Sequence, residues 1–317
     1  MDLTEQHSTW RWTSPVLNPE RHSRNAVLLM AAWLTLASPP ICAQVSYHVI
    51  PAGEPPIPGN SLPGDALADT HVGRGKNDIV QAWLAQPTRR YPHGVLGDTV
   101  EATAVRVRTR DGSVLSYVLP EDSVFEDLLP RVYDINRDGL DEIILVRSRQ
   151  QSGASLISLG IRDGKLVSLA ESEPMGNRNQ WMNPIGVADV DGDGNLELLV
   201  VLSPHENGML IEYKFDGLSI VPGHRISGVT NHIAGTRAQG MAALMDANGD
   251  GIPDVLIPSA DRRSLRAITF SFGVPMEFAR FSLPAPAAGN FENTQPRTLL
   301  IPLEDGRRVR IEWRGKE

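Results

Sequence analysis

Three segments of the sequence share one pattern: DINRDGLDE at residues 134–142, DVDGDGNLE at residues 189–197 and DANGDGIPD at residues 246–254. Each has Asp at its first position, Asp or Asn at its third, Asp at its fifth, Gly at its sixth and a carboxylate at its ninth. The segments begin 55 and 57 residues apart. A repeat of about this length indicates a propeller or a solenoid, in which each unit is one small group of secondary-structure elements.

Short apolar runs flank all three segments. The residues that follow them read IILV at 143–146, LLVV at 198–201 and VLI at 255–257, which indicates short buried strands. An EF-hand loop would need helices on both sides and a Glu at its twelfth position, where this sequence has an aliphatic residue each time. The three segments are therefore loops between strands, and the EF-hand is excluded.

The pattern suits a hard cation. Calcium binds six to eight oxygen atoms, and a chain that curls around the ion brings the side chains at positions 1, 3 and 5 together. The glycine at position 6 permits the tight turn, the carbonyl at position 7 offers a further oxygen, and the carboxylate at position 9 closes the site. Plain acidic turns also use Asp, Asn and Gly, but three of them at near-equal spacing favour three calcium sites. The expected ligands are Asp134, Asn136, Asp138, Leu140 and Glu142; Asp189, Asp191, Asp193, Asn195 and Glu197; and Asp246, Asn248, Asp250, Ile252 and Asp254.

The charge of the chain agrees with bound cations. The 317 residues include 38 acidic and 30 basic side chains, a net charge of −8, and ten of the carboxylates are expected ligands in the three loops. Without a cation each loop holds several like charges at short range, which is unfavourable. A net negative chain also lacks the basic surface that nucleic acids require, so no nucleic-acid partner is expected.

The motif D-x-[DN]-x-D-G-x-x-[DE] between short strands, at a spacing of about 55 residues, resembles the FG-GAP (VCBS-type) repeat. That family forms the β-propeller of integrin α subunits and of many bacterial secreted proteins. The resemblance covers roughly residues 77–317 and implies an all-β propeller of four-stranded blades that binds calcium, without implying a particular function. The sequence lacks the Phe-Gly and Gly-Ala-Pro signatures of that family at the blade edges.

A second periodic signal defines the expected blades. Glycine-ended turns at residues 112, 164, 217 and 273 lie between strand-like runs, as in β-hairpins. Each unit then has two strands joined by an acidic loop and two strands joined by a hairpin. The last unit lacks a fourth strand, which the run VSYHVI at 45–50 would supply, closing the ring without exposed edges. We predict five blades, with six as the alternative, at about residues 77–119, 130–172, 183–226, 240–283 and from 287 onward.

Successive connections of such a blade lie at opposite ends of its strands. The acidic loops therefore lie with the hairpin turns, and the first blade is expected to have its corresponding loop at 86–93. The connections at the other end are long and polar, at 120–131, 173–184 and 227–239. Aromatic side chains beside Asn, Arg and carboxylates suit sugars or polar peptides. The residues expected to contact a ligand are Glu126, Arg131, Arg147, Arg178, Trp181, Asn183, His205, Asn231, His232 and Arg237.

The N-terminus has the pattern of an export signal. A basic stretch precedes the apolar run AVLLMAAWLTLA at 26–37, which is too short for a transmembrane helix, and Ala43 offers a small residue at the cleavage site. We predict a signal peptide over 1–43 and a Pro/Gly-rich leader over 44–76. The mature chain is expected to be secreted or periplasmic, with no transmembrane domain. Lipid attachment at Cys42 is the alternative.

The sequence shows no catalytic constellation. The histidines at 93, 205 and 232 lie on separate loops without metal-ligand spacing, the mature chain has no cysteine nucleophile, and no G-x-S-x-G motif occurs. We therefore expect a calcium-stabilised module that binds a glycan, a cell-envelope component or a protein. The alternatives are a calcium-dependent polysaccharide lyase or hydrolase on the same scaffold and a purely structural adhesion module.

Overall fold

The computed structural model describes residues 44–50, by their backbone, and residues 63–314. Within these ranges the chain forms 20 β-strands joined by turns and contains no helix, so the expected all-β class is confirmed. It follows that no helix in this part is long and apolar enough to cross a membrane. The expected signal peptide at 1–43, with Cys42 and the cleavage site after Ala43, lies outside the described residues.

The first sheet combines strands of the first two expected blades. Its path runs β2-β3-β5-β7-β8-β9, with β4 paired to β3 and β6 paired to β7. Strand β5 joins the two halves, because Phe125 pairs with Ala102 of β3 and with Arg147 of β7. We expected residues 120–131 to form a long polar connection, but Val124 and Phe125 lie in a short buried strand. The strands are β2 (Ile79–Thr88), β3 (Glu101–Thr109), β4 (Val114–Val118), β5 (Ser123–Phe125), β6 (Arg131–Tyr133), β7 (Glu142–Arg149), β8 (Gly153–Arg162) and β9 (Lys165–Glu171).

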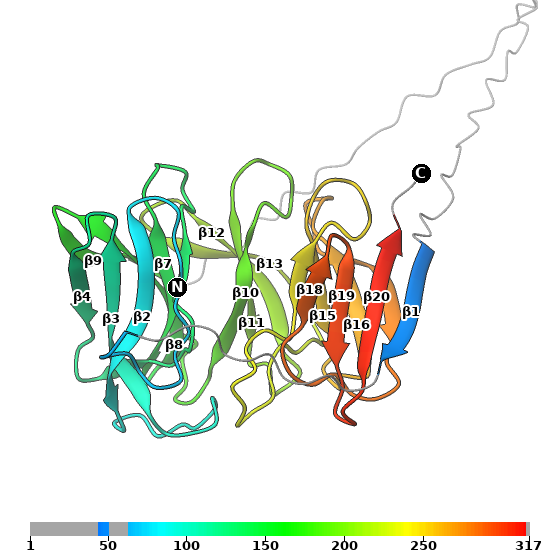
Figure 1. Cartoon of the computed structure of the whole chain (residues 1–317), viewed down its shortest axis with the longest axis horizontal. Coiled ribbons are helices and arrows are strands. Elements are labelled where there is room, and N and C mark those ends of the chain that lie inside the picture. Colours follow the sequence, from blue (N-terminus) through cyan, green and yellow to red (C-terminus); the bar gives the residue numbers. More distant parts are fainter. Residues whose placement is uncertain (1–43, 51–62, 315–317) are drawn as a thin grey trace, which may run out of the picture. The chain divides into compact units, whose positions relative to one another are not determined.

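Each of the three remaining sheets has four antiparallel strands. Two of them follow chain order, β10-β11-β12-β13 and β14-β15-β16-β17, and the third has the order β1-β20-β19-β18. In the third sheet β1 lies beside β20 (Figure 1). Tyr47 pairs with Ile311 in this register. Closure into a five- or six-bladed ring stays a prediction. The strands are β1 (Gln44–Ile50), β10 (Met182–Ala188), β11 (Glu197–Leu202), β12 (Met209–Phe215), β13 (Ile220–Ser227), β14 (Ala243–Met245), β15 (Asp254–Pro258), β16 (Ser264–Thr269), β17 (Met276–Ser282), β18 (Glu292–Gln295), β19 (Thr298–Pro302) and β20 (Arg308–Arg314).

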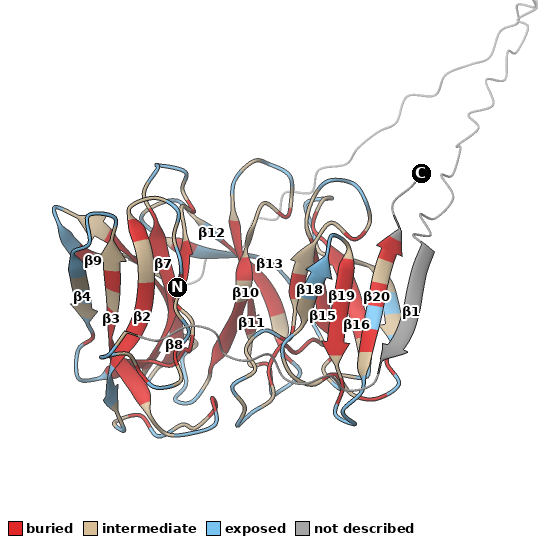
Figure 2. Cartoon of the chain, viewed as in Figure 1, coloured by how far each residue is buried: buried red, intermediate tan, exposed pale blue. Residues whose placement is uncertain are grey.

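The expected glycine-ended hairpins are confirmed. They connect β3 to β4, β8 to β9, β12 to β13 and β16 to β17. The four turn glycines have φ angles between 71° and 90°, a backbone region that glycine reaches at little steric cost. The strand after each turn lies at the outside of its group, and Figure 2 shows the contrast between these partly exposed strands and the buried central ones.

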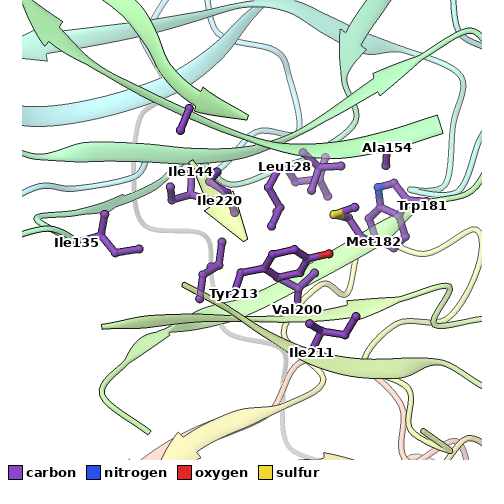
Figure 3. Packing of buried hydrophobic residues seen from close by; sticks show 14 of the residues in the cluster. Leu128, Ile135, Ile144, Ala154, Trp181, Met182, Val200, Ile211, Tyr213 and Ile220 are labelled. Carbon is purple, nitrogen blue, oxygen red and sulfur yellow. The ribbon is translucent and has the colours of Figure 1, made fainter. Parts of the chain in front are cut away.

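Neighbouring groups of strands pack face to face. Val200 of β11 packs in one core cluster with Ile144 of β7, whereas the adjacent Leu199 packs in another with Val255 of β15. Successive side chains of a strand point to opposite faces, so β11 is buried on both. This explains why its sequence is an unbroken apolar run rather than an alternation. Figure 3 shows the first of these clusters, in which Val200 and Trp181 are labelled.

Part of the segment expected as an irregular leader pairs with the first sheet. Isolated bridges join residues 66 and 73 to β2. Strand β2 is therefore the second strand of its group, and the connection equivalent to the acidic loops is 74–78. The placement of 86–93 at the acidic-loop end was wrong, because the turn between β2 and β3, at 89–100, lies at the opposite end. Two isolated bridges leave no alternating apolar run in the sequence, which is why this pairing was not predicted.

Candidate functional site

Each acidic segment forms a loop between the first two strands of its group. The three loops follow β6, β10 and β14 and precede β7, β11 and β15. The residue at position 9 is the first residue of the second strand. It pairs with the residue that precedes position 1, so every loop is closed by the equivalent strand pair. These pairs are Glu142 with Tyr133, Glu197 with Ala188 and Asp254 with Met245. We call this end of the sheets the acidic-loop end and the other the opposite end.

Backbone hydrogen bonds hold the loop carboxylates in place. In the second loop the N–H of Val190 donates to Glu197 at 3.1 Å, and the N–H of Asp193 donates to Asp191 at 3.0 Å. The first and third loops repeat both bonds, to positions 9 and 3. The local chain therefore folds each loop around its own acidic side chains.

The second loop has the oxygen cluster that a cation needs. Asp189, Asp191 and Glu197 each place a carboxylate oxygen within 4.8 Å of the others, the one such group of three in the described part of the chain. Two buried loop oxygens, Oδ1 of Asp134 and Oε1 of Glu197, have no hydrogen-bond partner. Buried oxygens without a partner are costly, and carboxylate oxygens are calcium ligands. The residues present therefore fit this ion.

Burial raises the pKa of all three carboxyl groups at position 9. The pKa values of Glu142 and Glu197 are raised to about 7, and that of Asp254 to about 6, first by desolvation and further by neighbouring carboxylates. Each of these side chains is fully buried. A bound cation would favour their ionised forms.

The first and third loops differ from the second because Asn occupies position 3. The amide N–H groups donate to the carboxylates at positions 5 and 9, at 3.2 and 3.4 Å from Asn136 and at 3.0 and 3.2 Å from Asn248. In these two loops an amide therefore contacts two of the carboxylates that would hold a cation. Of the three expected calcium sites, the described structure therefore shows a carboxylate cluster for the second loop.

The structure places most of the residues expected to contact a ligand inside the opposite end rather than on its surface. Seven of the ten are buried, and only Arg178, His205 and Arg237 are exposed. Polar character alone suggested solvated loops, but these side chains are hydrogen-bonded to one another and to the backbone. The buried residues are Glu126, Arg131, Arg147, Trp181, Asn183, Asn231 and His232.

Trp181 is the centre of an aromatic cluster at the opposite end. Its Nε1–H donates to the carbonyl of Glu126 at 2.9 Å, and its ring stacks on His205, 5.9 Å between centroids, and meets His232 edge-on at 4.8 Å. Nε2 of His205 lies 2.8 Å from Nδ1 of His232, whose Nε2 lies 2.9 Å from the carbonyl oxygen of Thr236. A carbonyl only accepts, so His232 is protonated at Nε2 and accepts from His205 at Nδ1. The exposed His205 is left with an unprotonated Nδ1 as a hydrogen-bond acceptor.

Both histidines of this cluster are neutral at physiological pH. Desolvation lowers the pKa of His205 and of His232 to about 4, and repulsion from a neighbouring histidine lowers each further. A neutral imidazole with a free nitrogen accepts hydrogen bonds from hydroxyl or amide donors. The exposed edge of the cluster therefore suits a polar, uncharged ligand group.

Other buried residues tie the connections of the opposite end together. Asp127 forms an ion pair with Arg131 at 2.8 Å and accepts from Nε2 of Gln239 at 3.2 Å. Asn183 and Asn231 each donate to the other's backbone carbonyl, at 3.2 and 3.0 Å. Buried polar groups need such partners, so these four side chains and Gln239 hold the scaffold of the site.

Two further arginines of the expected set, Arg147 and Arg237, are held in ion pairs. Arg147 lies 3.1 Å from Glu171, and Arg237 lies 2.8 Å from Asp69 and 2.7 Å from Asp98. Because Arg237 is exposed, its pairs are screened by solvent and leave it accessible.

Two candidate residues were not in the expected set: His93, which the sequence offered without a partner, and Glu101. Nδ1 of His93 lies 2.6 Å from Oε1 of Glu126, and the hydroxyl of Ser148 donates to Oε2 of the same carboxyl at 2.5 Å. Burial raises the pKa of Glu126 and also that of Glu101, which is itself buried. If residues 66–73 had been counted as the first strand of their group, the connection at 89–100 would have been placed at the opposite end, and His93 with it.

Glu101 is expected to make the stability of the chain depend on pH. Burial and nearby carboxylates raise its pKa from 4.5 to about 10, so the folded chain keeps a proton that the unfolded chain loses. Stability that is fully present below pH 4.5 is therefore lost as the pH rises toward 10. Glu101→Gln should raise the free energy of unfolding by several kcal/mol at pH 8, because each pH unit above 4.5 costs the parent up to about 1.4 kcal/mol, and should change it little at pH 4.5. Urea unfolding at both pH values tests this, and an equal change at both would contradict it.

Four-stranded groups that repeat with the same acidic loop between their first two strands define a class of β-repeat proteins. Residues 134–200, which span the first two acidic loops, match the family described as FG-GAP-like repeat. This part of the chain is therefore similar to an FG-GAP-type repeat. A comparison with curated proteins gave no match.

Proposed function

We propose that the chain is a calcium-stabilised β-propeller, secreted or periplasmic, that binds a glycan, a cell-envelope component or a protein through its opposite end. Three calcium ions would occupy the acidic loops, and the first 43 residues would act as the export signal. The FG-GAP-type repeat and the fit of the loop carboxylates to a hard cation support the metal part of this proposal. The basic stretch and short apolar run before Ala43 support export.

When bound, calcium would supply positive charge among the loop carboxylates, and it would have no direct role in ligand binding. Successive connections of antiparallel strands lie at opposite ends, so the loops are separated from the aromatic cluster by the length of the strands. Calcium would fix the loops at the acidic-loop end, whereas the sequence of the connections at the opposite end can vary. Binding residues are commonly found on variable connections that a rigid scaffold holds in position.

The observation that carries the binding proposal is the exposed His205 on a buried support. Its Nδ1 is fixed as an acceptor by the bond to His232, and its ring is held by stacking on Trp181. The exposed Arg178 lies in the adjoining connection. A rigid acceptor and an exposed cationic donor on connections at the same end of the sheets suit hydroxyl-rich or peptide ligands, which offer both donors and acceptors.

The binding proposal is tested by substituting exposed residues, because changes to buried ones would also disturb the fold. The purified protein is screened against soluble glycans, peptidoglycan fragments and envelope extracts, together with the double variant His205→Ala/Arg178→Ala. The variant is expected to weaken binding at least about tenfold. The control Lys165→Ala/Arg225→Ala, which alters exposed residues of β9 and β13, should bind like the parent. Binding that survives in the first variant would place the ligand elsewhere.

A polysaccharide lyase or hydrolase is the second candidate, favoured by the pair His93 and Glu126. A buried carboxylate that orients an imidazole is an arrangement used in general base catalysis, since it fixes the tautomer of the ring. Turnover of a polysaccharide that His93→Ala abolishes would favour this candidate over a binding module. Binding without turnover would favour the module.

A further inference from the structure

We infer that Lys214 occupies the cation position of the second acidic loop and competes there with calcium, so that this loop is the weakest of the three calcium sites. The inference rests on the calcium binding proposed above. Lys214 lies on β12, outside the repeated motif. Its presence distinguishes the second acidic loop from the first and the third, which share the same motif.

The contacts of Lys214 are those of a cation in the loop. Its Nζ lies 2.9 Å from Oδ2 of Asp191, 3.5 Å from Oδ2 of Asp193 and 3.9 Å from Oε1 of Glu197. These carboxylates stand at positions 3, 5 and 9, the positions whose side chains converge on an ion. The ammonium group therefore contacts three of the carboxylates that would hold calcium.

The strand register places the lysine there. Lys214 lies on β12 directly opposite Glu197 of β11. In the first sheet Ile143 pairs with Leu159, so the residue facing position 9 is Gly160. By the same count, from Val255 paired with Ile268, the residue facing position 9 of the third loop is Thr269. Neither of these residues carries a charge.

The basic residues near the other loops make fewer contacts. Arg162 lies 3.6 Å from Asp138 of the first loop, and Arg297 lies 2.8 Å from Asp246 of the third. Each of these arginines reaches one carboxylate of its loop. The centre of each of those loops instead holds the neutral amide at position 3.

Composition gives a reason for this difference. The second loop has Asp191 at position 3 where the others have Asn, so it holds four ligand carboxylates and they hold three. Lys214 adds one positive charge, which offsets the additional carboxylate of the second loop. Like charges at such distances repel strongly, so the lysine stabilises the loop when no metal is bound and must be displaced when calcium enters. Nearly half of its side-chain surface is exposed, which leaves it room to move away.

The test is Lys214→Met, measured by calcium titration calorimetry and by thermal unfolding in EDTA and in calcium chloride. One of the calcium sites should bind about tenfold more tightly. The melting temperature should fall in EDTA and should gain more from added calcium than that of the parent. Arg225→Met, which removes the same charge from the adjacent strand β13, should change neither quantity.

A second variant separates charge compensation from loss of packing. Asp191→Asn in the Lys214→Met background gives the second loop the carboxylate count of the other two, so it should restore the melting temperature in EDTA. A Lys214→Met protein with unchanged calcium affinity, or with an equal loss of melting temperature with and without calcium, would overturn the inference. A parent that binds no calcium would instead overturn the proposed calcium sites, and the EDTA melts would still report on charge compensation.

Discussion

Removal of calcium with a chelator is expected to lower the melting temperature of the protein by at least about 10 °C. A ligand present at one hundred times its dissociation constant stabilises the folded state by about 2.7 kcal/mol per site, so the three proposed sites would contribute about 8 kcal/mol. For a chain of this size each kcal/mol corresponds to about 2–4 °C. Thermal unfolding followed by circular dichroism in calcium chloride and in EGTA measures the difference.

Loop variants assign this effect to the acidic loops. Asp191→Ala removes a carboxylate from the second loop and should reduce the calcium-dependent gain in melting temperature, whereas Glu121→Ala removes the same charge from an exposed position in the connection before β5 and should leave it intact. Magnesium in place of calcium should stabilise less, because it requires a stricter octahedral geometry. Identical melting with and without chelator would contradict the proposed role of calcium.

Trp181→Ala is expected to lower the free energy of unfolding by about 3–5 kcal/mol. The ring is almost fully buried, belongs to the core cluster with Ile144 and Val200, and donates a hydrogen bond to the carbonyl of Glu126. Its removal leaves a cavity and a buried carbonyl without that donor, and both are destabilising. Urea unfolding at a fixed calcium concentration measures the loss.

The neighbouring His205 supplies the matched control for this prediction. It is stacked on the same ring but exposed, so His205→Ala should cost less than about 1 kcal/mol. Trp181→Phe keeps an aromatic ring without the N–H and should fall between the two. A Trp181→Ala protein as stable as the parent would show that the tryptophan contributes little to the core and would return it to the set of candidate ligand contacts.

The sequence alone was sufficient for the local features of this protein. The acidic loops are recognisable because all their side-chain ligands lie within nine residues, and the hairpins because a glycine with positive φ is needed at one place in each turn. The central strands are recognisable because burial on both faces requires continuous apolar runs such as LLVV at 198–201. These signals are short-range, so the pattern reports them directly.

Tertiary structure decided the character of the opposite end. Trp181 contacts Glu126 across 55 residues of sequence, and His205 contacts His232 across 27. Whether such polar side chains face solvent depends on which connection packs over them, and that depends on the stacking of whole sheets. Strand β5 and the bridged residues 66 and 73 were also missed, because one or a few rungs leave no periodic pattern.

Tertiary structure also makes the second acidic loop differ from the other two. The motif by itself predicts three equivalent cation sites, since its ligands are local. The difference between them comes from Lys214, 17 residues beyond Glu197 in the chain but directly opposite it in the sheet. The chemistry of a loop can therefore be predicted from the residues of that loop. Burial and charge pairing depend on strand register and sheet packing, which bring residues that are distant in the sequence to within a few ångströms.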